Sequence, residues 1–439
     1  MSKVNNFLEN KVMPVAAKIA GQRHLQALRD GLILTMPLLI IGSIFLVIRW
    51  LPWFGDAERQ YMITSPFWQN ILNYPYDATF NTMALIAAFG IAYRLAESYK
   101  VDGLTAGAVS LVTFLMVTPF QTVFTLADKS TVDVTGVIPT ALTGSGGLFV
   151  AIIVALLSTE IYRWVVQKDI IIKMPDGVPP SVSKSFVALI PGFVVIIIFW
   201  LVRIGIEQTD FESVHNIVRD LLQQPISKLS GTLVGMLVVV FLVELLWTTG
   251  LHGASIVGGV MSPIWLQAAA ENAAAMQAGK EVPHIFTGQF YEIFVHVGGS
   301  GATLALVLAM VLFAKSQQLK QLGRLSIGPG IFNINEPITF GMPIVMNPVM
   351  MIPFILAPLA IVITTWMGME FFGVAKPNGA VPPWTTPIFL GGFLATGKVS
   401  SLVMQLVNFG VAFAIYFPFM KAYDKTLVKQ ENDANNQAA

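Results

Sequence analysis

The sequence predicts an all-α polytopic membrane protein with about ten transmembrane helices, plus re-entrant hairpins in its C-terminal half. Of its 439 residues, 55% are hydrophobic and 12% are charged, whereas soluble domains carry about 25% charged residues. The mean hydropathy of the whole chain is +0.69. Long stretches without Asp, Glu, Lys or Arg recur from end to end, and a helix needs about 20 mostly apolar residues to cross a bilayer.

The expected spans are the stretches that lie between successive charges. They cover Gly31–Ile48, Ala78–Tyr93, Gly103–Ala127, Val134–Thr159, Ser185–Val202, Leu229–Val243, Leu245–Ala270, Ile293–Ala314, Pro337–Met369, Pro377–Gly397 and Val399–Met420. Together they give about ten crossings of the membrane.

Lys and Arg cluster between particular spans, and basic loops stay in the cytoplasm. The clusters are Lys3, Lys11, Lys18, Arg23 and Arg29; Arg163, Lys168, Lys173 and Lys184; Lys315, Lys320 and Arg324; and Lys421, Lys425 and Lys429. They predict an even number of spans with both termini cytoplasmic.

The net charge of +1 gives no electrostatic basis for binding nucleic acid. Because the chain has no cysteine, disulfides, thiolate metal sites and a cysteine nucleophile are excluded.

Three parts are expected: an N-terminal membrane half (1–228), a C-terminal membrane half (229–422) and a polar cytoplasmic tail (423–439).

The C-terminal half differs from the N-terminal half because glycine and proline interrupt its apolar segments. The interruptions are Gly250, Gly253, Gly258 and Gly259; Gly298-Gly299-Ser300-Gly301; Pro337, Pro343, Pro348, Pro353 and Pro358; and Pro377, Pro382, Pro383 and Pro387. Backbone groups freed at membrane depth must be satisfied by protein or by a wet cavity. The breaks therefore predict hairpins or unwound helices lining a solute site; kinked, packed helices are the simpler alternative.

The most informative segment is Gly330–Gly341, where Glu336 stands between Asn335 and Pro337 inside apolar sequence. A charge at membrane depth costs several kcal/mol, so it normally faces a cavity or a partner. Amide and carboxylate groups supply the donors and acceptors that sugar hydroxyls need. Glu336 is therefore predicted to meet a sugar-sized polar solute. The alternative is a structural ion pair with a lysine or arginine.

His252 lies between Leu251 and Gly253, shortly after Trp247. Intramembrane histidines are rare and usually functional, although a lone histidine can also be structural. The C–H faces of a pyranose ring are apolar, so Trp247 and Trp384 are expected to sandwich it. Tryptophan near a helix end also serves as an interfacial anchor, an alternative that fits Trp384 less well because it lies in a proline-rich break.

Four weaker candidates complete the predicted site. The Gly298–Gly299 turn either presents backbone amides to a solute or makes a tight turn or helix contact. His296 precedes it. Arg94 ends a span, where it can instead snorkel to the headgroups, and Asn81 is polar inside an apolar run.

Patterns typical of soluble enzymes do not hold up in this chain. Gly392–Lys398 has the spacing of a phosphate loop, but Val399 stands where Ser or Thr should bind magnesium. The same segment lies in a membrane stretch with no soluble strand before it. We expect no cofactor and no metal site. An ATP-driven pump is excluded because the chain has no nucleotide-binding domain.

Three segments, Asn335–Pro348, Leu251-His252-Gly253 and Lys173–Val182, together carry a resemblance. The chain resembles the membrane component, enzyme IIC, of the lactose/cellobiose/diacetylchitobiose family of the phosphoenolpyruvate-dependent sugar phosphotransferase system. The resemblance runs over nearly the whole chain, and the Asn335-Glu336-Pro337 segment is its most specific part.

The resemblance implies a homodimer in a bacterial cell membrane, with about ten spans and two re-entrant hairpins per subunit. The N-terminal half would build the dimer contact, and the C-terminal half would hold a buried β-linked disaccharide. It places His252 and Glu336 near the 6-hydroxyl of the sugar. The other implied contacts are Trp247, Asn335, the Gly298–Gly299 turn and Trp384, with Asn81 and Arg94 as looser matches.

The implied activity is group translocation. The carrier binds an outside sugar and turns the site inward, where a separate IIB subunit, supplied by IIA upstream, donates a phosphoryl group from a phosphocysteine. Glu336 would act as a base or only position the hydroxyl, and His252 would orient either partner. An ion- or proton-coupled secondary transporter is the alternative, with Glu336 and His252 as a proton relay. A membrane sensor or scaffold fits the interrupted helices poorly.

Overall fold

The structure is a computed structural model, and it describes residue 11 and residues 13–50, 66–126, 130–175, 177–342, 344–345 and 347–438. The chain forms two compact units. Unit 1 consists of Met1–Ala20, Val47–Thr64 and Leu229–Ala439, and unit 2 consists of Gly21–Leu46 and Ser65–Lys228. Lys3, Asp176, Pro343 and Met346, which belong to the clusters and motifs above, lie outside the described residues.

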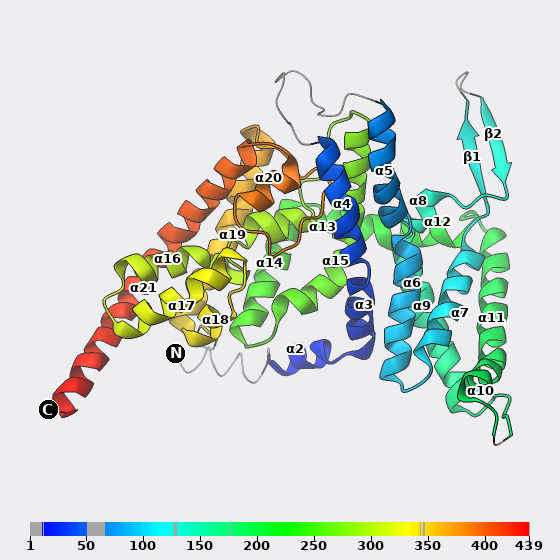
Figure 1. Cartoon of the computed structure of the whole chain (residues 1–439), viewed down its shortest axis with the longest axis horizontal. Coiled ribbons are helices and arrows are strands. Elements are labelled where there is room, and N and C mark those ends of the chain that lie inside the picture. The colour runs from blue at the N-terminus through cyan, green and yellow to red at the C-terminus, as the bar shows by residue number, and fades with distance from the viewer. Residues whose placement is uncertain are drawn as a thin grey trace. The chain divides into compact units, whose positions relative to one another are not determined.

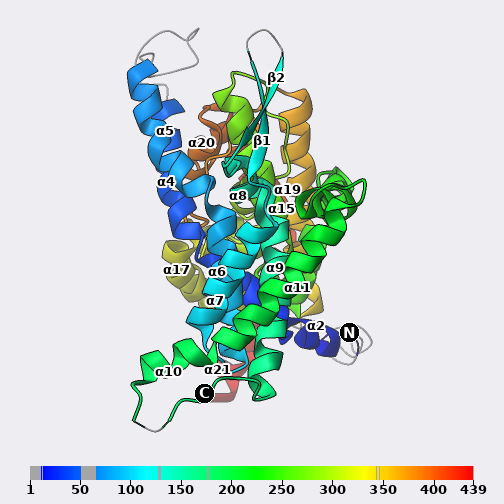
Figure 2. The same ribbon diagram turned by 90° about the vertical axis from the view of Figure 1, so that its right-hand side faces the viewer.

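Unit 2 is mainly a group of helices packed side by side (Figures 1 and 2). From residue 23 to residue 230 the elements are α3 (Arg23–Ile33), α4 (Met36–Trp50), α5 (Pro66–Phe80), α6 (Met83–Ser98), α7 (Gly103–Val117), β1 (Gln121–Thr125), β2 (Thr131–Thr135), α8 (Thr140–Thr143), η2 (Ser145–Gly147), α9 (Leu148–Gln167), α10 (Pro180–Val187), α11 (Leu189–Glu207), α12 (Val214–Val218), η3 (Arg219–Gln223) and α13 (Gln224–Ser230). Helices α6, α7 and α9 contact one another, and α3 packs on α6. A Cβ on Gly31 would lie 2.5 Å from the backbone of Ile91, so a small residue is needed where α3 meets α6.

The expectation of an all-α chain needs one correction. Strands β1 and β2 pair antiparallel, with Gln121 opposite Thr135, and the hairpin projects past the ends of α7 and α11 (Figure 1). Both strands are rich in threonine and valine, which favour extended backbone. The distance between charges cannot separate such a hairpin from a helix. The expected spans Gly103–Ala127 and Val134–Thr159 were therefore wrong where they included strand residues.

Unit 1 contains the interrupted helices. Its elements are α2 (Met13–Ala20), α14 (Leu233–Thr248), α15 (Gly253–Gln277), η4 (Phe290–Val295), η5 (Ser300–Ala302), α16 (Leu304–Phe313), α17 (Gln317–Ile331), α18 (Glu336–Gly341), α19 (Pro348–Phe371), α20 (Leu390–Thr396) and α21 (Ser400–Ala438). Helix α21 packs against α16 and α19, while α17 packs against α16 (Figure 1). Helix α14 contacts both α15 and α19.

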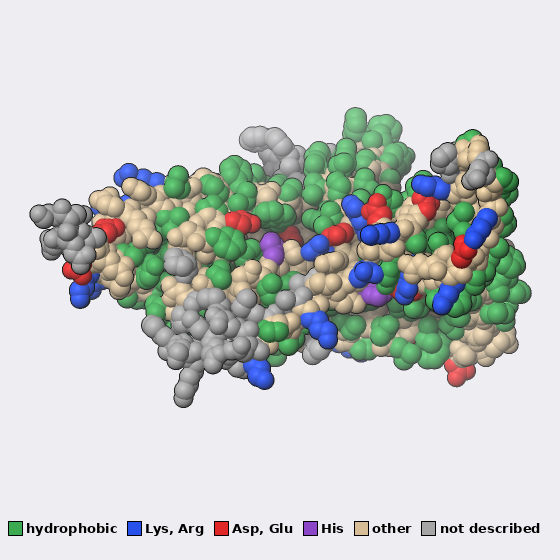
Figure 3. All heavy atoms as spheres, turned by 90° about the horizontal axis from the view of Figure 1, so that it is seen from below, with side chains coloured by type: hydrophobic (Ala, Val, Ile, Leu, Met, Phe, Trp, Pro, Cys, Tyr) green, Lys and Arg blue, Asp and Glu red, His purple; other side chains and the backbone are tan. Residues whose placement is uncertain are grey.

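The described residues include six helices long and apolar enough to cross a membrane, or up to eight if each bent pair is one span. One such pair, Phe290–Ala302 and Leu304–Phe313, is bent by 53°. The expected span Pro377–Gly397 contains only the short helix α20, because its prolines leave most of the segment irregular. Large hydrophobic side chains are exposed on many helices, as the surface in Figure 3 shows. The fold is therefore that of a helical membrane protein, and the count of about ten spans stays a prediction.

Side-chain amides replace regular backbone hydrogen bonds where the helices of unit 1 are interrupted. Asn272 of α15 donates through Nδ2 to the carbonyls of His284 and Pro377, both at 2.8 Å, and accepts from the His284 amide at 2.9 Å. Other amides donate in the same way at 2.5–3.0 Å: Asn335 to the carbonyl of Ser300, Gln405 to that of Ile293, and Asn408 to that of Phe294. These contacts confirm that protein groups satisfy backbone freed at the breaks.

Candidate functional site

The sequence before His252 folds into a helix end that is followed at once by a new helix. Gly250 takes a left-handed conformation with φ +84°. The amides of Gly250 and Leu251 donate to the carbonyls of Trp247 and Leu246, at 3.0 and 3.2 Å. This Schellman ending satisfies the last carbonyls of α14. It places His252 at the N-cap of α15.

The His252 ring is exposed at this junction and is oriented by its neighbours. Its Nδ1 accepts a hydrogen bond from the Ser255 amide at 3.1 Å, and the Ser255 Oγ lies 2.8 Å away. Because Nδ1 accepts from an amide, the neutral ring carries its proton on Nε2. The ring centroids of His252 and Trp247 lie 4.5 Å apart. The structure thus brings these two predicted residues together.

Glu244 is a buried carboxylate on α14, three residues before Trp247, with an exposed fraction of 0%. Its Oε1 lies 2.8 Å from the Nε2 of His296, which is also buried, and the ring of Tyr291 packs edge-on against His296. In the sequence, Glu244 separates two expected spans and His296 is a weak site candidate. The signal in the sequence was a lone carboxylate between two apolar stretches, because a charge in such a place normally has a buried partner or faces a cavity.

The turn that follows His296 depends on glycine. Gly298 and Gly299 have φ values of +87° and +91°, which L side chains rarely adopt. The Gly298 amide donates to the Oδ1 of Asn333 at 2.9 Å, and the Gly299 amide donates to the His296 carbonyl at 3.0 Å. Both amides are therefore occupied within the protein. Of the two alternatives, the tight turn describes this backbone, and a contact between the turn and a sugar stays a prediction.

Replacing Gly299 with alanine should destabilise the protein more than the same change at Gly373. Both glycines have positive φ, which L residues rarely adopt, and Gly299, with ψ −175°, lies in a region that only glycine commonly occupies. At Gly299 the new Cβ would also lie 2.6 Å from the Asn333 carbonyl oxygen, whereas nothing lies within 4 Å at Gly373. We expect an extra cost of about 1–3 kcal/mol from this overlap, measured by denaturation of the purified variants. Equal stabilities would show that the turn is not tightly packed.

A second Schellman ending terminates α17, with Asn333 in place of the usual glycine. Asn333 has φ +61°. The amides of Asn333 and Ile334 donate to the carbonyls of Gly330 and Pro329, at 3.1 and 3.0 Å. Asparagine tolerates this conformation better than most residues, and unlike glycine it brings a side chain. Asn333 lies inside the Gly330–Gly341 segment, but nothing near it in the sequence indicates this role.

Asn335 and Glu336 begin α18. The Nδ2 of Asn335 donates to the Ser300 carbonyl at 2.5 Å, which ties the start of this helix to the glycine turn. Glu336 occupies the first helical position, followed by Pro337. Its carboxylate is exposed and makes no hydrogen bond or ion pair with any residue that the structure describes. The alternative of a structural ion pair is therefore not observed.

Trp384 lies on a turn in the irregular segment before α20, where the Thr386 amide donates to the Pro383 carbonyl at 2.9 Å. Its side chain is 44% exposed, whereas Trp247 is 3% exposed. Trp384 therefore offers an open aromatic face. The expected sandwich of a sugar between the two rings would require Trp247 to lose part of its cover, and it stays a prediction.

The two looser candidates belong to unit 2 and have local partners there. The Nδ2 of Asn81 donates to Asp77 at 3.4 Å, and the Asn81 carbonyl accepts from Thr143 at 2.7 Å. Arg94 pairs with Glu97 at 3.2 Å, with both side chains about half exposed. Such exposed pairs contribute little to stability. A contact between either residue and the solute stays a prediction.

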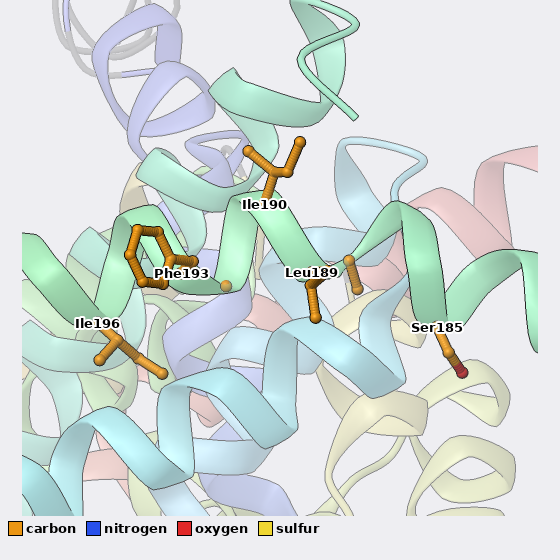
Figure 4. Close-up of a pocket in the computed structure, with 7 residues that line it drawn as sticks. Ser185, Leu189, Ile190, Phe193 and Ile196 are labelled. Carbon is orange, nitrogen blue, oxygen red and sulfur yellow. The ribbon is translucent and has the colours of Figure 1, made fainter. Parts of the chain in front are cut away.

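A pocket in unit 2 differs in character from a sugar site (Figure 4). It is lined by residues of α10 and α11 and by Ala188 between them, and Ser185 alone among the lining residues carries a polar side chain. A sugar site needs several converging polar groups. In unit 1, by contrast, polar side chains from the end of α17 and the start of α18 contact the glycine turn.

Comparisons with known proteins show which family the chain resembles over most of its length. The family model for "Phosphotransferase system, EIIC" matches residues 29–358. The chain is 58% identical over 436 residues to the lichenan permease IIC component of Bacillus subtilis (strain 168), covering 99% of this chain and 96% of that protein. It is 56% identical over 435 residues to the cellobiose-specific EIIC component of Geobacillus stearothermophilus, covering 98% and 96% of the two.

A solved structure is also closely similar. The transporter ChbC, the IIC component from the N,N'-diacetylchitobiose-specific phosphotransferase system, superposes with a TM-score of 0.93 at 57% identity. The match covers 97% of this chain and 99% of that one. The family model covers most of the chain, and these relatives match it over nearly their whole lengths. The chain therefore belongs to the phosphotransferase system EIIC family, as the sequence resemblance implied.

Proposed function

We propose that this permease binds a β-linked disaccharide, with cellobiose or N,N'-diacetylchitobiose as the expected sugar, and carries it inward for phosphorylation. A separate IIB subunit, itself supplied by IIA, then donates the phosphoryl group from its phosphocysteine. The phosphorus–sulfur bond breaks and a phosphorus–oxygen bond forms at the 6-hydroxyl of the sugar, whose proton leaves. The named specificities of the relatives for lichenan, cellobiose and diacetylchitobiose support this class of substrate.

The observation that carries the proposal is the position of Glu336. It is a carboxylate in apolar sequence that is exposed and unpaired among the described residues. A charge in such a sequence is costly unless it serves a cavity or a partner. The neighbouring Asn335 ties its helix to the glycine turn. An unpaired acceptor on a fixed helix start is suited to receive a sugar hydroxyl.

In this proposal Glu336 accepts a hydrogen bond from the 6-hydroxyl, and either takes its proton or only positions it. General base catalysis typically contributes about 10²–10⁴-fold. The neutral His252 ring carries its proton on Nε2, because Nδ1 accepts from the Ser255 amide, and in this proposal that N–H donates to a sugar oxygen or to Glu336 when the sugar binds. Trp384 supplies an apolar face for the ring. Neither Glu336 nor His252 carries phosphate.

The test uses the purified protein in sealed vesicles with phosphorylated IIB on the cytoplasmic side. We expect sugar phosphate to form only when IIB is present, at a rate unchanged by an uncoupler. Accumulation of unmodified sugar that collapses with the uncoupler would instead establish a secondary transporter. Binding of a panel of β-linked disaccharides to the purified protein then identifies the substrate, and failure of the whole panel would refute the proposed specificity.

Replacing His252 with alanine should weaken sugar affinity or turnover while leaving most of the protein folded. The lost N-cap of α15 costs about 1 kcal/mol, which serine at the same position should restore without restoring the imidazole. We therefore expect His252→Ser to be as stable as the wild type and as impaired in function as His252→Ala. His284→Ala, at an exposed histidine of the same unit, is the control. Normal function of His252→Ser would leave His252 with a capping role only.

The remaining features of the proposal are a homodimer, about ten spans with two re-entrant hairpins, and cytoplasmic termini. The distribution of lysine and arginine supports the orientation. The large hydrophobic side chains exposed on α11, which include Phe193 and Leu201, provide a surface for a second copy in the bilayer. Labelling of single cysteines from either side of the membrane tests the orientation, since the chain has no cysteine of its own.

A further inference from the structure

The Asn333 side chain joins three segments of unit 1. Its Oδ1 accepts from the Gly298 amide at 2.9 Å. Its Nδ2 donates to the carbonyls of Trp384 and Thr386, at 2.7 and 3.0 Å. One neutral side chain therefore fastens the end of α17 to the glycine turn and to the Trp384 turn.

The hydrogen-bonding capacity of Asn333 limits what it can do. An asparagine amide has two N–H donors, and both are used by carbonyl groups of this protein. The side chain is also 8% exposed. No donor remains for a sugar oxygen, and Oδ1 already accepts from the Gly298 amide, so the main action of Asn333 on a bound sugar is through the groups that it holds.

Those groups belong to the proposed sugar site. The two carbonyls flank Thr385, so the bonds fix the backbone of the Pro383–Thr386 turn on which the exposed Trp384 indole stands. The third bond fixes Gly298, whose own geometry leaves no room for a side chain, because a Cβ there would lie 2.3 Å from Leu304. A binding face is useful when its support keeps it in one place before the ligand arrives.

We propose that Asn333 is a positioning residue, which holds Trp384 and the glycine turn in their sugar-binding arrangement. This inference rests on the proposed function, because it assumes that Trp384 contacts the sugar. It adds a specific prediction: the clamp affects sugar affinity more than the chemical step, since Asn333 touches neither the hydroxyl nor the phosphoryl donor.

The chain offers a matched control for this clamp. Asn272 has the same pattern of bonds, with Nδ2 donating to two carbonyls and Oδ1 accepting from one amide, and its exposed fraction is 0%. It holds His284 and Pro377, which are not predicted sugar contacts. Loss of either clamp leaves three backbone groups without a partner, at comparable cost in stability. Only loss of Asn333 should weaken sugar binding.

Two variants at Asn333 separate the backbone from the side chain. Asn333→Gly keeps the left-handed helix end and removes all three bonds. Asn333→Asp keeps the acceptor for Gly298 but faces two carbonyls without a donor. Because both variants release the Trp384 turn, both should raise the Kd for the sugar and the KM for phosphorylation by about tenfold. We expect kcat to stay within about threefold of the wild type.

The experiment measures sugar Kd, IIB-dependent kcat and KM, and thermal stability of full-length Asn333→Gly, Asn333→Asp, Asn272→Ala and Trp384→Ala. Asn272→Ala should lose stability and keep wild-type affinity. In the Trp384→Ala background, Asn333→Gly should weaken binding by less than about threefold, because the aromatic face is already gone.

Wild-type affinity in a folded Asn333 variant would overturn the inference, as would equal loss of affinity in Asn272→Ala or full additivity with Trp384→Ala. If Asn333→Gly does not fold, Asn333→Asp decides the same comparison. If neither folds while Asn272→Ala does, Asn333 is structural and the inference fails. Failure of the wild type to bind any β-linked disaccharide would instead refute the proposed function, so the two failures are distinguishable.

Discussion

Replacing Glu336 with glutamine is expected to lower IIB-dependent sugar phosphorylation by about 10²–10⁴-fold. The change preserves size and removes the negative charge. Because the carboxylate has no partner among the described residues, its loss should leave folding and membrane insertion intact. Rates of sugar-phosphate formation in vesicles, with excess phosphorylated IIB, provide the measurement.

Glu370→Gln is the matched control for this prediction. Glu370 is another exposed glutamate of unit 1, near the end of α19, and it too makes no pair with a described residue. Its variant should phosphorylate sugar at the wild-type rate. If Glu336→Gln also retained full product formation, Glu336 would have no part in the mechanism. A rise in KM with unchanged kcat would assign Glu336 to sugar binding rather than to proton transfer.

Replacing His296 with leucine should destabilise the protein by about 3–5 kcal/mol, because it leaves the buried Glu244 carboxylate without its partner. Glu244 has an exposed fraction of 0%, so water cannot replace the lost contact without a rearrangement of α14. The measurement is denaturation of the purified protein in detergent. The loss should also reach the sugar site, since His296 accepts from the Gly299 amide through its carbonyl and leads directly into the glycine turn.

The control for this pair has the same chemistry at the surface. His284 contacts Glu271 with side-chain exposed fractions of 38% and 44%, and exposed pairs are worth about 0–1 kcal/mol. His284→Leu should therefore cost much less than His296→Leu. Replacing Glu244 and His296 together by leucine should recover part of the loss, because no unpaired charge then remains. Equal costs for the two single histidine variants would show that the buried contact between Glu244 and His296 adds no more stability than the surface contact.

The predicted fold and site depended on features that are local in the sequence. Charge-free stretches indicated a membrane protein, and glycine and proline located the breaks around Gly250 and Gly298, because these residues act on their own backbone. Asn335 and Glu336 were also found from local sequence, because they are polar residues inside an apolar stretch. The confirmed EIIC membership followed from short motifs that surround these residues.

What sequence reasoning missed depends on pairing between distant segments. Glu244 was used to end a span, because nothing nearby in the sequence shows that His296 lies against it. The β1–β2 hairpin was counted as helix, since the spacing of charges does not report the period of the side chains. Asn333 was assigned no role, because its three partners lie 35, 51 and 53 residues away.

The use of amides to fasten the broken helices has a consequence for a protein in an energised membrane. A transmembrane voltage exerts a force on each charge, worth about 2.3 kcal/mol per elementary charge for every 100 mV crossed. Asn272, Asn333, Gln405 and Asn408 carry no net charge, so voltage does not pull on these bonds. A cell whose membrane potential rises and falls can therefore keep these side-chain bonds at the helix breaks unchanged throughout.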